Sequence, residues 1–380
     1  MSSSNKIGVA VIATGSRGTN VTENLLRDSG HNVKVVAVYD QNREFAERAV
    51  EKWNEPTAKI CDSYLEAINT AGVDWVLIFS PNVYHKEHIL AAFTAGKHVF
   101  TEKPLATSIE DCQAIYEAHQ RAAVLFATGF VLRYAPIYRK AKELLTAGTL
   151  GKILSIDANE NIPPGHGGYI MMNWRRHRQL SGPHILEKCV HDIDLLNWFT
   201  ESLPNRIAAF GGLDFFIPEN QRLQDENAAD SFSAWPDHTR DCESPFTSKK
   251  DIFDTQVAIL QYRSGAKVMF QATMSNAIPE RRMYFSCSEG NLIVELYSST
   301  LKYRRLGDAN ETVLDFAADG HGGGDSVIMK ELFHCMCANS APECSGDEGL
   351  ESAVVALSID QAITSQTIID LEPIWQKLNR

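Results

Sequence analysis

The chain has 380 residues, which at a usual size of about 150 residues per domain predicts two domains. Hydrophobic residues make up 44% and charged residues 22%, which excludes a disordered or fibrous chain and suits a globular enzyme. The 36 basic and 48 acidic residues give a net charge of −12, so nucleic acid and anionic membranes are not expected partners. A small-molecule partner is expected instead.

Three further features concern the compartment. No stretch approaches the roughly 18 apolar residues that a membrane span needs. The N-terminus passes into a predicted strand without the apolar region of a signal peptide. The eight cysteines are scattered, without CxxC pairs or zinc-ligand spacing, so we expect free thiols and no metal site. These features favour a cytoplasmic protein.

The first third of the chain alternates short β-branched runs with amphipathic stretches. Strands are predicted at 7–13, 33–39, 75–79, 98–101 and 124–128, and helices at 19–27, 43–53, 64–69, 85–95 and 109–121. Because parallel strands need crossover connections, this alternation favours a parallel sheet covered by helices. The pattern predicts a doubly wound α/β Rossmann-type domain that binds a dinucleotide, over residues 1–129.

The pattern changes after residue 129. Helices are predicted at 137–147 and 185–199, with a strand at 152–161 and a flexible Gly/Pro-rich loop from 163 onward. Antiparallel strands are predicted at 206–216, 255–262, 266–275, 283–288, 292–297 and 301–305, and residues 218–251 as a surface excursion or lid. Residues 130–380 are thus expected to form an α+β substrate-binding and oligomerisation domain. Its sheet is mixed and mostly antiparallel, and its closing helices lie within 325–380.

A glycine-containing turn lies between the first strand and the first helix, with the sequence Ala13-Thr14-Gly15-Ser16-Arg17-Gly18. Gly15 lets the backbone approach a pyrophosphate, and Gly18 lets the helix pack on the strand. Phosphate charge then meets the free N–H groups of the helix N-terminus. Thr14, Ser16 and Arg17 complete this predicted cofactor loop, in which Ala13 replaces the first glycine of the usual fingerprint.

Asp40 ends the second predicted strand, 22 residues after Gly18. A carboxylate there accepts hydrogen bonds from ribose hydroxyls and repels a 2′-phosphate, which favours NAD over NADP. Arg43 lies three residues later and can reach a 2′-phosphate, so NADP stays open as an alternative. A second alternative is that Asp40 only caps the following helix.

Several separated motifs resemble the Gfo/Idh/MocA family of NAD(P)-dependent sugar and polyol oxidoreductases. They are Ser80-Pro81-Asn82-Val83-Tyr84-His85, Thr101-Glu102-Lys103-Pro104, Gly129-Phe130, Gly148-Thr149-Leu150-Gly151, Glu187-Lys188-Cys189-Val190-His191-Asp192 and Gly322-Gly323-Gly324-Asp325. The resemblance covers nearly the whole chain. It implies that Lys103 lies beside the nicotinamide and contacts the reacting hydroxyl. It also places six residues of the first two motifs among those that bind the cofactor: Ser80, Pro81, Asn82, His85, Glu102 and Lys103.

The resemblance further implies that the family's Asp-x-x-x-His helix corresponds to Glu187-x-x-x-His191, with a glutamate one methylene longer than the usual aspartate. On a helix, Glu187, His191 and Asp194 share one face. Imidazole titrates near neutral pH, so His191 is the candidate base and Lys103 the group that orients the substrate, although these roles can be exchanged. Glu187 is expected to hydrogen-bond a neighbouring hydroxyl. A metal site at Glu187 and His191 lacks a third ligand.

Further candidates for substrate binding are more ambiguous. Arg133 and Tyr134 follow the last predicted Rossmann strand and are expected at the edge of a cleft, with packing as the alternative. Trp174 suits stacking on a sugar face, and Arg175 and His184 suit hydroxyl or carboxylate recognition, with solvated charge as the alternative.

The combined prediction is an NAD(P)-dependent oxidoreductase that transfers a hydride between nicotinamide and a secondary hydroxyl, or ketone, of a sugar, glycoside or cyclitol. Two alternatives stay open. One is a glycoside-cleaving enzyme that uses transient oxidation by bound NAD, and the other is a non-enzymatic NAD(H)-binding regulator. The resemblance also implies a homodimer or homotetramer formed through the second domain's sheet.

Overall fold

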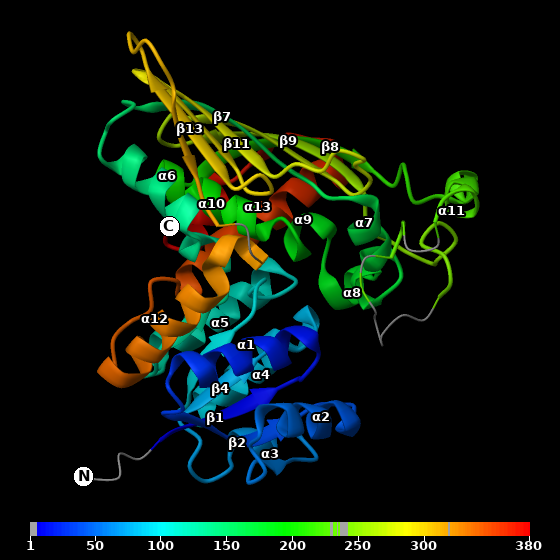
Figure 1. The fold of residues 1–380 in the computed structure, drawn as a ribbon, viewed down its shortest axis with the longest axis vertical. Helices are drawn as coiled ribbons and strands as arrows, with labels where there is room; N and C mark the ends of the chain where they lie inside the picture. Colours follow the sequence, from blue (N-terminus) through cyan, green and yellow to red (C-terminus); the bar gives the residue numbers. More distant parts are fainter. Residues whose placement is uncertain (1–5, 229–230, 234, 236–241, 318–319) are drawn as a thin grey trace. The chain divides into compact units, whose positions relative to one another are not determined.

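A computed structural model describes residues 6–228, 231–233, 235, 242–317 and 320–380 (Figure 1). The chain divides into two compact units, unit 1 (Met1–Tyr134 and Gly323–Leu350) and unit 2 (Ala135–Gly322 and Glu351–Arg380). Residues 323–350 thus belong to unit 1, whereas the sequence analysis placed them with the closing helices of the second domain. The reason is tertiary packing: a Cβ at Gly324 would lie 2.3 Å from the carbonyl oxygen of Val131, and Ser326 Oγ donates to Asp28.

Unit 1 is built on a six-stranded parallel sheet with the order β3-β2-β1-β4-β5-β6. Its strands are β1 (Ile7–Ile12), β2 (Val33–Tyr39), β3 (Lys59–Ile60), β4 (Trp75–Ile78), β5 (His98–Thr101) and β6 (Phe126–Thr128). Its helices are α1 (Ser16–Asp28), α2 (Arg43–Trp53), α3 (Tyr64–Ile68), α4 (His85–Thr94), α5 (Ile109–Arg121) and α12 (Gly324–Ala338), with the 3-10 turns η1 (Asn82–Tyr84) and η2 (Val131–Tyr134).

The strand order of unit 1 reverses between β1 and β4. Four residues of β4, and all but the first of β1, are buried, because helices cover both faces of the sheet. In such sheets ligands bind beyond the carboxyl ends of the strands at the point of reversal. The predicted Rossmann-type architecture is confirmed.

Unit 2 is built on a nine-stranded sheet with the order β14-β13-β12-β11-β7-β10-β9-β8-β15, in which only the β7–β10 pairing is parallel among the described strands. Its strands are β7 (Ile153–Asn161), β8 (Pro204–Gly212), β9 (Thr255–Tyr262), β10 (Lys267–Thr273), β11 (Arg282–Cys287), β12 (Gly290–Glu295), β13 (Thr300–Arg305), β14 (Thr312–Asp315) and β15 (Ile369–Asp370). The predicted mixed, mostly antiparallel sheet is confirmed.

Helices α6 (Pro136–Thr146) and α10 (Val190–Thr200) and the larger part of α13 (Gly346–Ser365) pack on one face of this sheet (Figure 1). The other helical segments are α7 (Pro164–Met171), η3 (Trp174–Arg176), α8 (Arg178–Ser181), α9 (His184–Glu187), η4 (Pro218–Asn220), α11 (Arg222–Glu226), η5 (Gly320–Gly323) and α14 (Glu372–Lys377). Buried and exposed residues alternate along β9 and β10, so one face meets the helices. No helix of the described residues covers the opposite face.

Three predicted elements of unit 2 are wrong in detail. The predicted flexible loop after residue 163 contains α7, which begins with Pro164. Proline is tolerated in the first turn of a helix, because the N–H groups there have no partner within the helix. The predicted helix 185–199 is two helices, α9 and α10, separated at Lys188 and Cys189. The strand predicted to reach residue 216 ends at Gly212. The carboxylate of Asp254 accepts hydrogen bonds from the backbone N–H groups of residues 214–216, so these groups cannot pair with a neighbouring strand.

The predicted excursion 218–251 shares a buried apolar cluster with α7. Phe232 and Phe246 are buried in a cluster with Met171 and Ile170 of α7. Residues 229–230, 234 and 236–241 of the excursion lie outside the described residues. Among the residues that the structure does describe, no helix is long and apolar enough to span a bilayer.

Candidate active site

The predicted cofactor residues of unit 1 follow the carboxyl ends of neighbouring strands. Ala13 follows β1, Asp40 follows β2, Ser80 comes just after β4, Glu102 follows β5 and Gly129 follows β6. Carboxyl ends of parallel strands share one edge of the sheet, so residues up to 116 positions apart are gathered there. This edge is the candidate cofactor site.

The glycines of the loop after β1 have different roles. A Cβ at Gly18 would lie 2.3 Å from the carbonyl oxygen of Ala13 and 3.1 Å from Phe79, so glycine is required there for α1 to pack. A Cβ at Gly15 would meet no atom within 4 Å, and its φ of −59° suits any residue. The protein itself therefore does not need a glycine at position 15. An empty space at a helix N-terminus fits the close approach of a pyrophosphate.

Asp40 supports this loop directly. Its Oδ2 accepts a hydrogen bond of 2.7 Å from the backbone N–H of Thr14, and its Oδ1 accepts one from the N–H of Asn42. The side chain that caps α2 is Asn42, so Asp40 is not the helix cap. Arg43 is exposed and pairs with Glu47 and Asp62. The carboxylate at the ribose position and the engaged arginine fit NAD better than NADP.

Arg17 joins three of the predicted motifs within unit 1. Its Nε donates to Glu102 and its Nη1 donates to Asp325, each over 2.6 Å. The other oxygen of Glu102 accepts from the backbone N–H of Lys103. Burial lowers the pKa of the Arg17 guanidinium, but the two carboxylates outweigh burial and hold that pKa above its usual value. The glycine loop thus fixes the backbone that carries Lys103.

His85 holds the same segment from the side of α4. Its Nδ1 lies 2.8 Å from the carbonyl oxygen of Pro104, and its Nε2 lies 2.9 Å from that of Ser80. Ser80 Oγ in turn lies 3.0 Å from Nδ1 of His88. His85 and Asn82 are buried, so these motif residues position backbone around the site.

The predicted catalytic residues of unit 2 lie on α9 and α10. Glu187 ends α9, whereas His191 and Asp194 lie in the first half of α10. Asp194 is buried and accepts from Ser352, which anchors α10 to α13. The ring of His191 lies 6.2 Å from that of His321. A break between α9 and α10 replaces the single helical face expected from the sequence.

Glu187 pairs with Arg175. Nε of Arg175 donates to Oε1 of Glu187 over 3.0 Å, and Nη1 of Arg175 donates to the hydroxyl of Tyr169 over 3.1 Å. The guanidinium also lies 4.5 Å from the ring centre of Trp174. Two predicted substrate residues, Trp174 and Arg175, therefore contact each other, and Arg175 takes up part of the indole surface predicted to stack on sugar.

A buried ion network lies beneath α10. Arg281 donates to both oxygens of Asp192, 2.9 and 2.7 Å away, and Nη2 of Arg281 lies 2.9 Å from Glu160. Lys188 lies 3.2 Å from the other oxygen of Glu160. Burial raises the pKa of Glu160, but Arg281 and Lys188 outweigh burial and lower it. The network holds α10, and with it His191, against β7 and the segment before β11.

Three other predicted substrate residues are buried. Arg133 lies 3.8 Å from Glu348, and the hydroxyl of Tyr134 donates to Glu331, both within unit 1. Burial, chiefly, raises the pKa of Tyr134. Nδ1 of His184 faces Gln256, and its Nε2 makes no hydrogen bond among the described residues. The packing alternative fits Tyr134 best, because its side chain is enclosed.

Some residues near these sites were not found by sequence reasoning. They are His166, Tyr169, Trp235, His321 and, as a partner of Arg17, Asp325. The Gly322-Gly323-Gly324-Asp325 motif was a usable signal for Asp325. The others carry no local signal, because their partners are distant in sequence.

The comparisons with known proteins agree with this arrangement. Residues 7–130 match the NAD-binding Rossmann-fold domain of the Gfo/Idh/MocA oxidoreductase family, and residues 138–293 match that family's C-terminal domain. The chain therefore belongs to the Gfo/Idh/MocA family of oxidoreductases.

Individual relatives are more distant. Inositol 2-dehydrogenase 3 of Saccharopolyspora erythraea is 36% identical over 51% of this chain and 54% of its own length. The 2,7-anhydro-N-acetylneuraminate hydratase of Escherichia coli K12 is 30% identical over 48% of this chain and 46% of its own length. The chain thus spans about half the length of these two relatives.

A solved structure extends the similarity of fold to the whole chain. Levoglucosan dehydrogenase in complex with NADH and levoglucosan has a TM-score of 0.82 over 96% of this chain and 99% of its own, at 17% identity. The predicted family, the predicted oxidoreductase class and the predicted NAD cofactor are confirmed.

Proposed function

We propose that this protein oxidises a secondary hydroxyl of a neutral sugar, glycoside or cyclitol with NAD, or reduces the corresponding ketone. The observation that carries the proposal is the edge of the parallel sheet in unit 1. An open space at Gly15, the carboxylate of Asp40 and the anchored Lys103 segment lie at the carboxyl ends of β1, β2 and β5.

The proposed mechanism assigns a role to each predicted catalytic residue. NAD held at this edge of unit 1 would supply the hydride acceptor for oxidation of the carbinol carbon. His191 takes the hydroxyl proton as the general base, so the alcohol loses one hydride and one proton and becomes a ketone. Lys103 binds a substrate oxygen and stabilises developing negative charge on it. Glu187, held by Arg175, binds a neighbouring hydroxyl.

The substrate classes come from the chemistry of unit 2 and from the relatives. Around α9 and α10 of unit 2, Arg175 pairs with Glu187, Lys188 with Glu160, and Arg281 with Asp192. Paired cations favour a neutral polyol over a sugar acid, because an anionic substrate would compete with buried carboxylates. Inositol and levoglucosan, which appear in the names of the relatives, are neutral polyols.

The test is NADH formation, followed at 340 nm, with myo-inositol, free hexoses and methyl glycosides, in wild type and in the variants Lys103→Met and His191→Ala. We expect turnover with a neutral polyol and a loss of kcat of at least about a hundredfold in each variant. Turnover that survives in both variants, in protein that is still folded, contradicts the assigned roles.

A second candidate function has one observation in its favour. The Escherichia coli relative is named a hydratase, and addition of water involves no net oxidation. Under this proposal NAD stays bound and is regenerated within each turnover, as in the glycoside-cleaving alternative. Product formation without net NADH, measured by chromatography beside the absorbance assay, distinguishes it from the first proposal.

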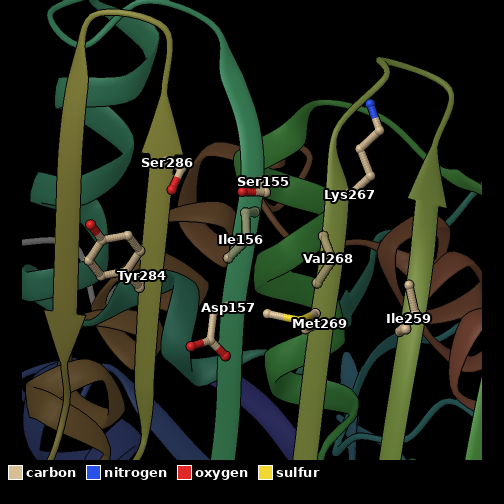
Figure 2. A pocket seen from close by; sticks show the side chains of 9 residues that line it. All are labelled: Ser155, Ile156, Asp157, Ile259, Lys267, Val268, Met269, Tyr284 and Ser286. Carbon is tan, nitrogen blue, oxygen red and sulfur yellow. The ribbon is translucent and has the colours of Figure 1, made fainter.

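We also propose that the protein is a cytoplasmic homo-oligomer. All eight cysteines are free, which suits a reducing compartment. The face of the sheet in unit 2 that no described helix covers is partly apolar, with exposed Phe210, Val257, Ile259 and Met269 on adjacent strands. A second copy of the chain would bury this face. A pocket of about 340 Å³ lies on this face of the sheet and is lined by side chains of β7, β9, β10 and β11 (Figure 2). The second copy would also contact this pocket.

A further inference from the structure

An aromatic group in unit 2 lies outside the residues used in the proposed reaction. Trp235 packs against the rings of His166 and Tyr169, with ring centres 4.7 and 5.2 Å apart and interplanar angles of 84° and 88°. His166 and Tyr169 lie on α7, and Trp235 lies in the excursion between β8 and β9. We call these three residues the aromatic platform.

The indole of Trp235 makes two ring contacts but remains partly exposed to solvent. It is 49% exposed, whereas most tryptophan side chains bury more of their surface. Both ring contacts are edge-to-face, and a parallel stack on the indole is absent from the described rings. About half of the indole is therefore available to a ligand. The apolar C–H face of a pyranose matches such a surface, because aromatic rings provide a large apolar area with a negative face.

The excursion that carries Trp235 is anchored to α7 by a close backbone contact. A Cβ at Gly168 would lie 1.8 Å from the carbonyl oxygen of Phe232, so only glycine permits this approach. Phe232 is itself buried against Phe246 and Met171. Trp235 follows Phe232 by three residues, so this contact lies close to the indole along the chain.

The platform also has polar groups suited to hydroxyls. Burial, followed by the nearby Lys188, holds the pKa of His166 well below its usual value, so its imidazole is neutral. A neutral imidazole offers one donor and one acceptor. Tyr169 contributes a hydroxyl that accepts from Arg175. A ring with several hydroxyls can thus find both apolar and polar partners here.

A chain of direct contacts links the platform to Glu187. Trp235 packs on Tyr169, Tyr169 Oη accepts from Arg175, and Arg175 pairs with Glu187 over 3.0 Å. Two side chains, Tyr169 and Arg175, therefore separate the indole from the glutamate proposed to bind a substrate hydroxyl. The indole and the glutamate therefore belong to one contact network of unit 2, as a substrate with a second ring would require.

We infer that the aromatic platform is a subsite for a second sugar ring, and that the preferred substrate is a glycoside or disaccharide rather than a free monosaccharide. This inference rests on the proposed function, whose substrate class it narrows. It assigns Trp235 as a specificity-determining residue that does not act on the reacting atoms.

The test compares matched sugars in wild type and variants. We would measure kcat/KM with glucose, methyl β-glucoside, cellobiose, maltose and lactose for wild type, Trp235→Ala, Trp235→Phe and the control Ile278→Ala, which removes another exposed apolar side chain of unit 2. We expect a disaccharide to be preferred. Trp235→Ala should lower its kcat/KM about fivefold to tenfold and change the values for single rings less than about twofold. Trp235→Phe should retain most of the preference.

Two outcomes overturn the subsite: no preference for a second ring in wild type, or an equal loss for one-ring and two-ring sugars in Trp235→Ala. If no sugar is oxidised, the proposed function fails, and saturation-transfer NMR with cellobiose and lactose then decides the subsite separately. A disaccharide signal that is present in wild type and lost in Trp235→Ala supports it, and a signal that is absent from wild type or unchanged in the variant overturns it.

Gly168→Ala provides an independent check. The added methyl displaces the excursion from α7, so the preference for two rings should fall while turnover of single rings persists. If the variant is unstable, Trp235→Ala alone carries the test.

Discussion

Ala13 occupies the position of the first glycine in the usual dinucleotide fingerprint, and its backbone conformation is strained. Its φ is +68°, in the left-handed region that glycine adopts freely and that costs other residues about 1 kcal/mol. The chain thus retains the backbone of the fingerprint without its glycine. This strain is tolerated because the N–H of Ala13 donates to Tyr39 over 2.7 Å.

Ala13→Gly should therefore stabilise the protein. We expect a gain of about 0.5 kcal/mol, since relief of the left-handed strain exceeds the extra chain entropy of glycine in the unfolded state. Thermal or urea unfolding measures it. Asn54→Gly, at another left-handed position, is the control and should gain less, because asparagine tolerates this conformation. A loss of stability in Ala13→Gly would refute the strain argument.

Arg17→Gln should weaken both stability and cofactor binding. It leaves the carboxylates of Glu102 and Asp325, both largely buried, without their cation, and we expect a loss of about 2 kcal/mol in the free energy of unfolding. The affinity for NADH, measured by fluorescence, should also fall, because Glu102 holds the amide of Lys103. Arg222→Gln, which breaks an exposed pair with Glu226, should change neither quantity appreciably.

His88 predicts a pH dependence of stability. Burial and the nearby His85 lower its pKa from 6.5 to about 4, and the opposing Glu87 does not offset them. Below pH 6.5 the unfolded chain takes up the proton that the folded chain refuses, so stability falls as the pH drops toward 4, by at most about 3 kcal/mol. Above pH 6.5 His88 is mostly neutral in both the folded and the unfolded chain, so the stability lost at low pH is fully retained there.

Unfolding by urea at pH 7.5, 6, 5 and 4 measures this effect. His88→Gln keeps a polar side chain near Ser80 but cannot take up the proton, so its stability should fall less steeply between pH 6.5 and 4. Parallel pH curves for wild type and variant would show that other groups, such as buried His85 and His184, account for the dependence.

At the scale of elements, the loop before α1 contains one glycine that the fold requires, Gly18, and one that we assign to ligand binding alone, Gly15. Gly15→Val fills open space, so we expect stability to change by less than about 0.5 kcal/mol while NADH affinity falls more than about tenfold. Gly18→Ala drives a methyl into the backbone of Ala13 and should destabilise the protein by about 2 kcal/mol. Fluorescence titration and thermal unfolding of both variants test the pair, and undiminished NADH binding by Gly15→Val would remove the pyrophosphate assignment.

The elements of unit 1 were predictable because each follows from a local pattern. Buried β-branched runs with helices between them strongly favour a parallel sheet. The predicted strands match β1, β2, β4, β5 and β6 within two residues. Elements of unit 2 that sequence reasoning missed have weak local signals. Helix α7 contains three glycines within a Gly/Pro-rich stretch, and its helical form depends on backbone packed against Gly167 and Gly168.

At the scale of the whole molecule, the uncovered sheet face predicts self-association. Ile259 and Met269 are register partners on β9 and β10 and are 59% and 56% exposed, which exposes a continuous apolar area. Ile259→Lys should shift an oligomer toward monomer, measured by light scattering coupled to size-exclusion chromatography. Ile278→Lys, an exposed residue outside the strands, is the control, and an unchanged mass in Ile259→Lys would count against this face as the interface.

The sequence by itself determined the family and the parallel architecture of unit 1, since motifs after strands are local properties of the chain, and it predicted the positions of the candidate site. Only the tertiary structure decided that Arg17 meets Asp325, 308 residues away, that Arg175 holds Glu187, and that Trp235 packs on α7. The physical reason is that such contacts depend on which side chains the packed backbone brings within a few ångströms, and no spacing along the chain records this.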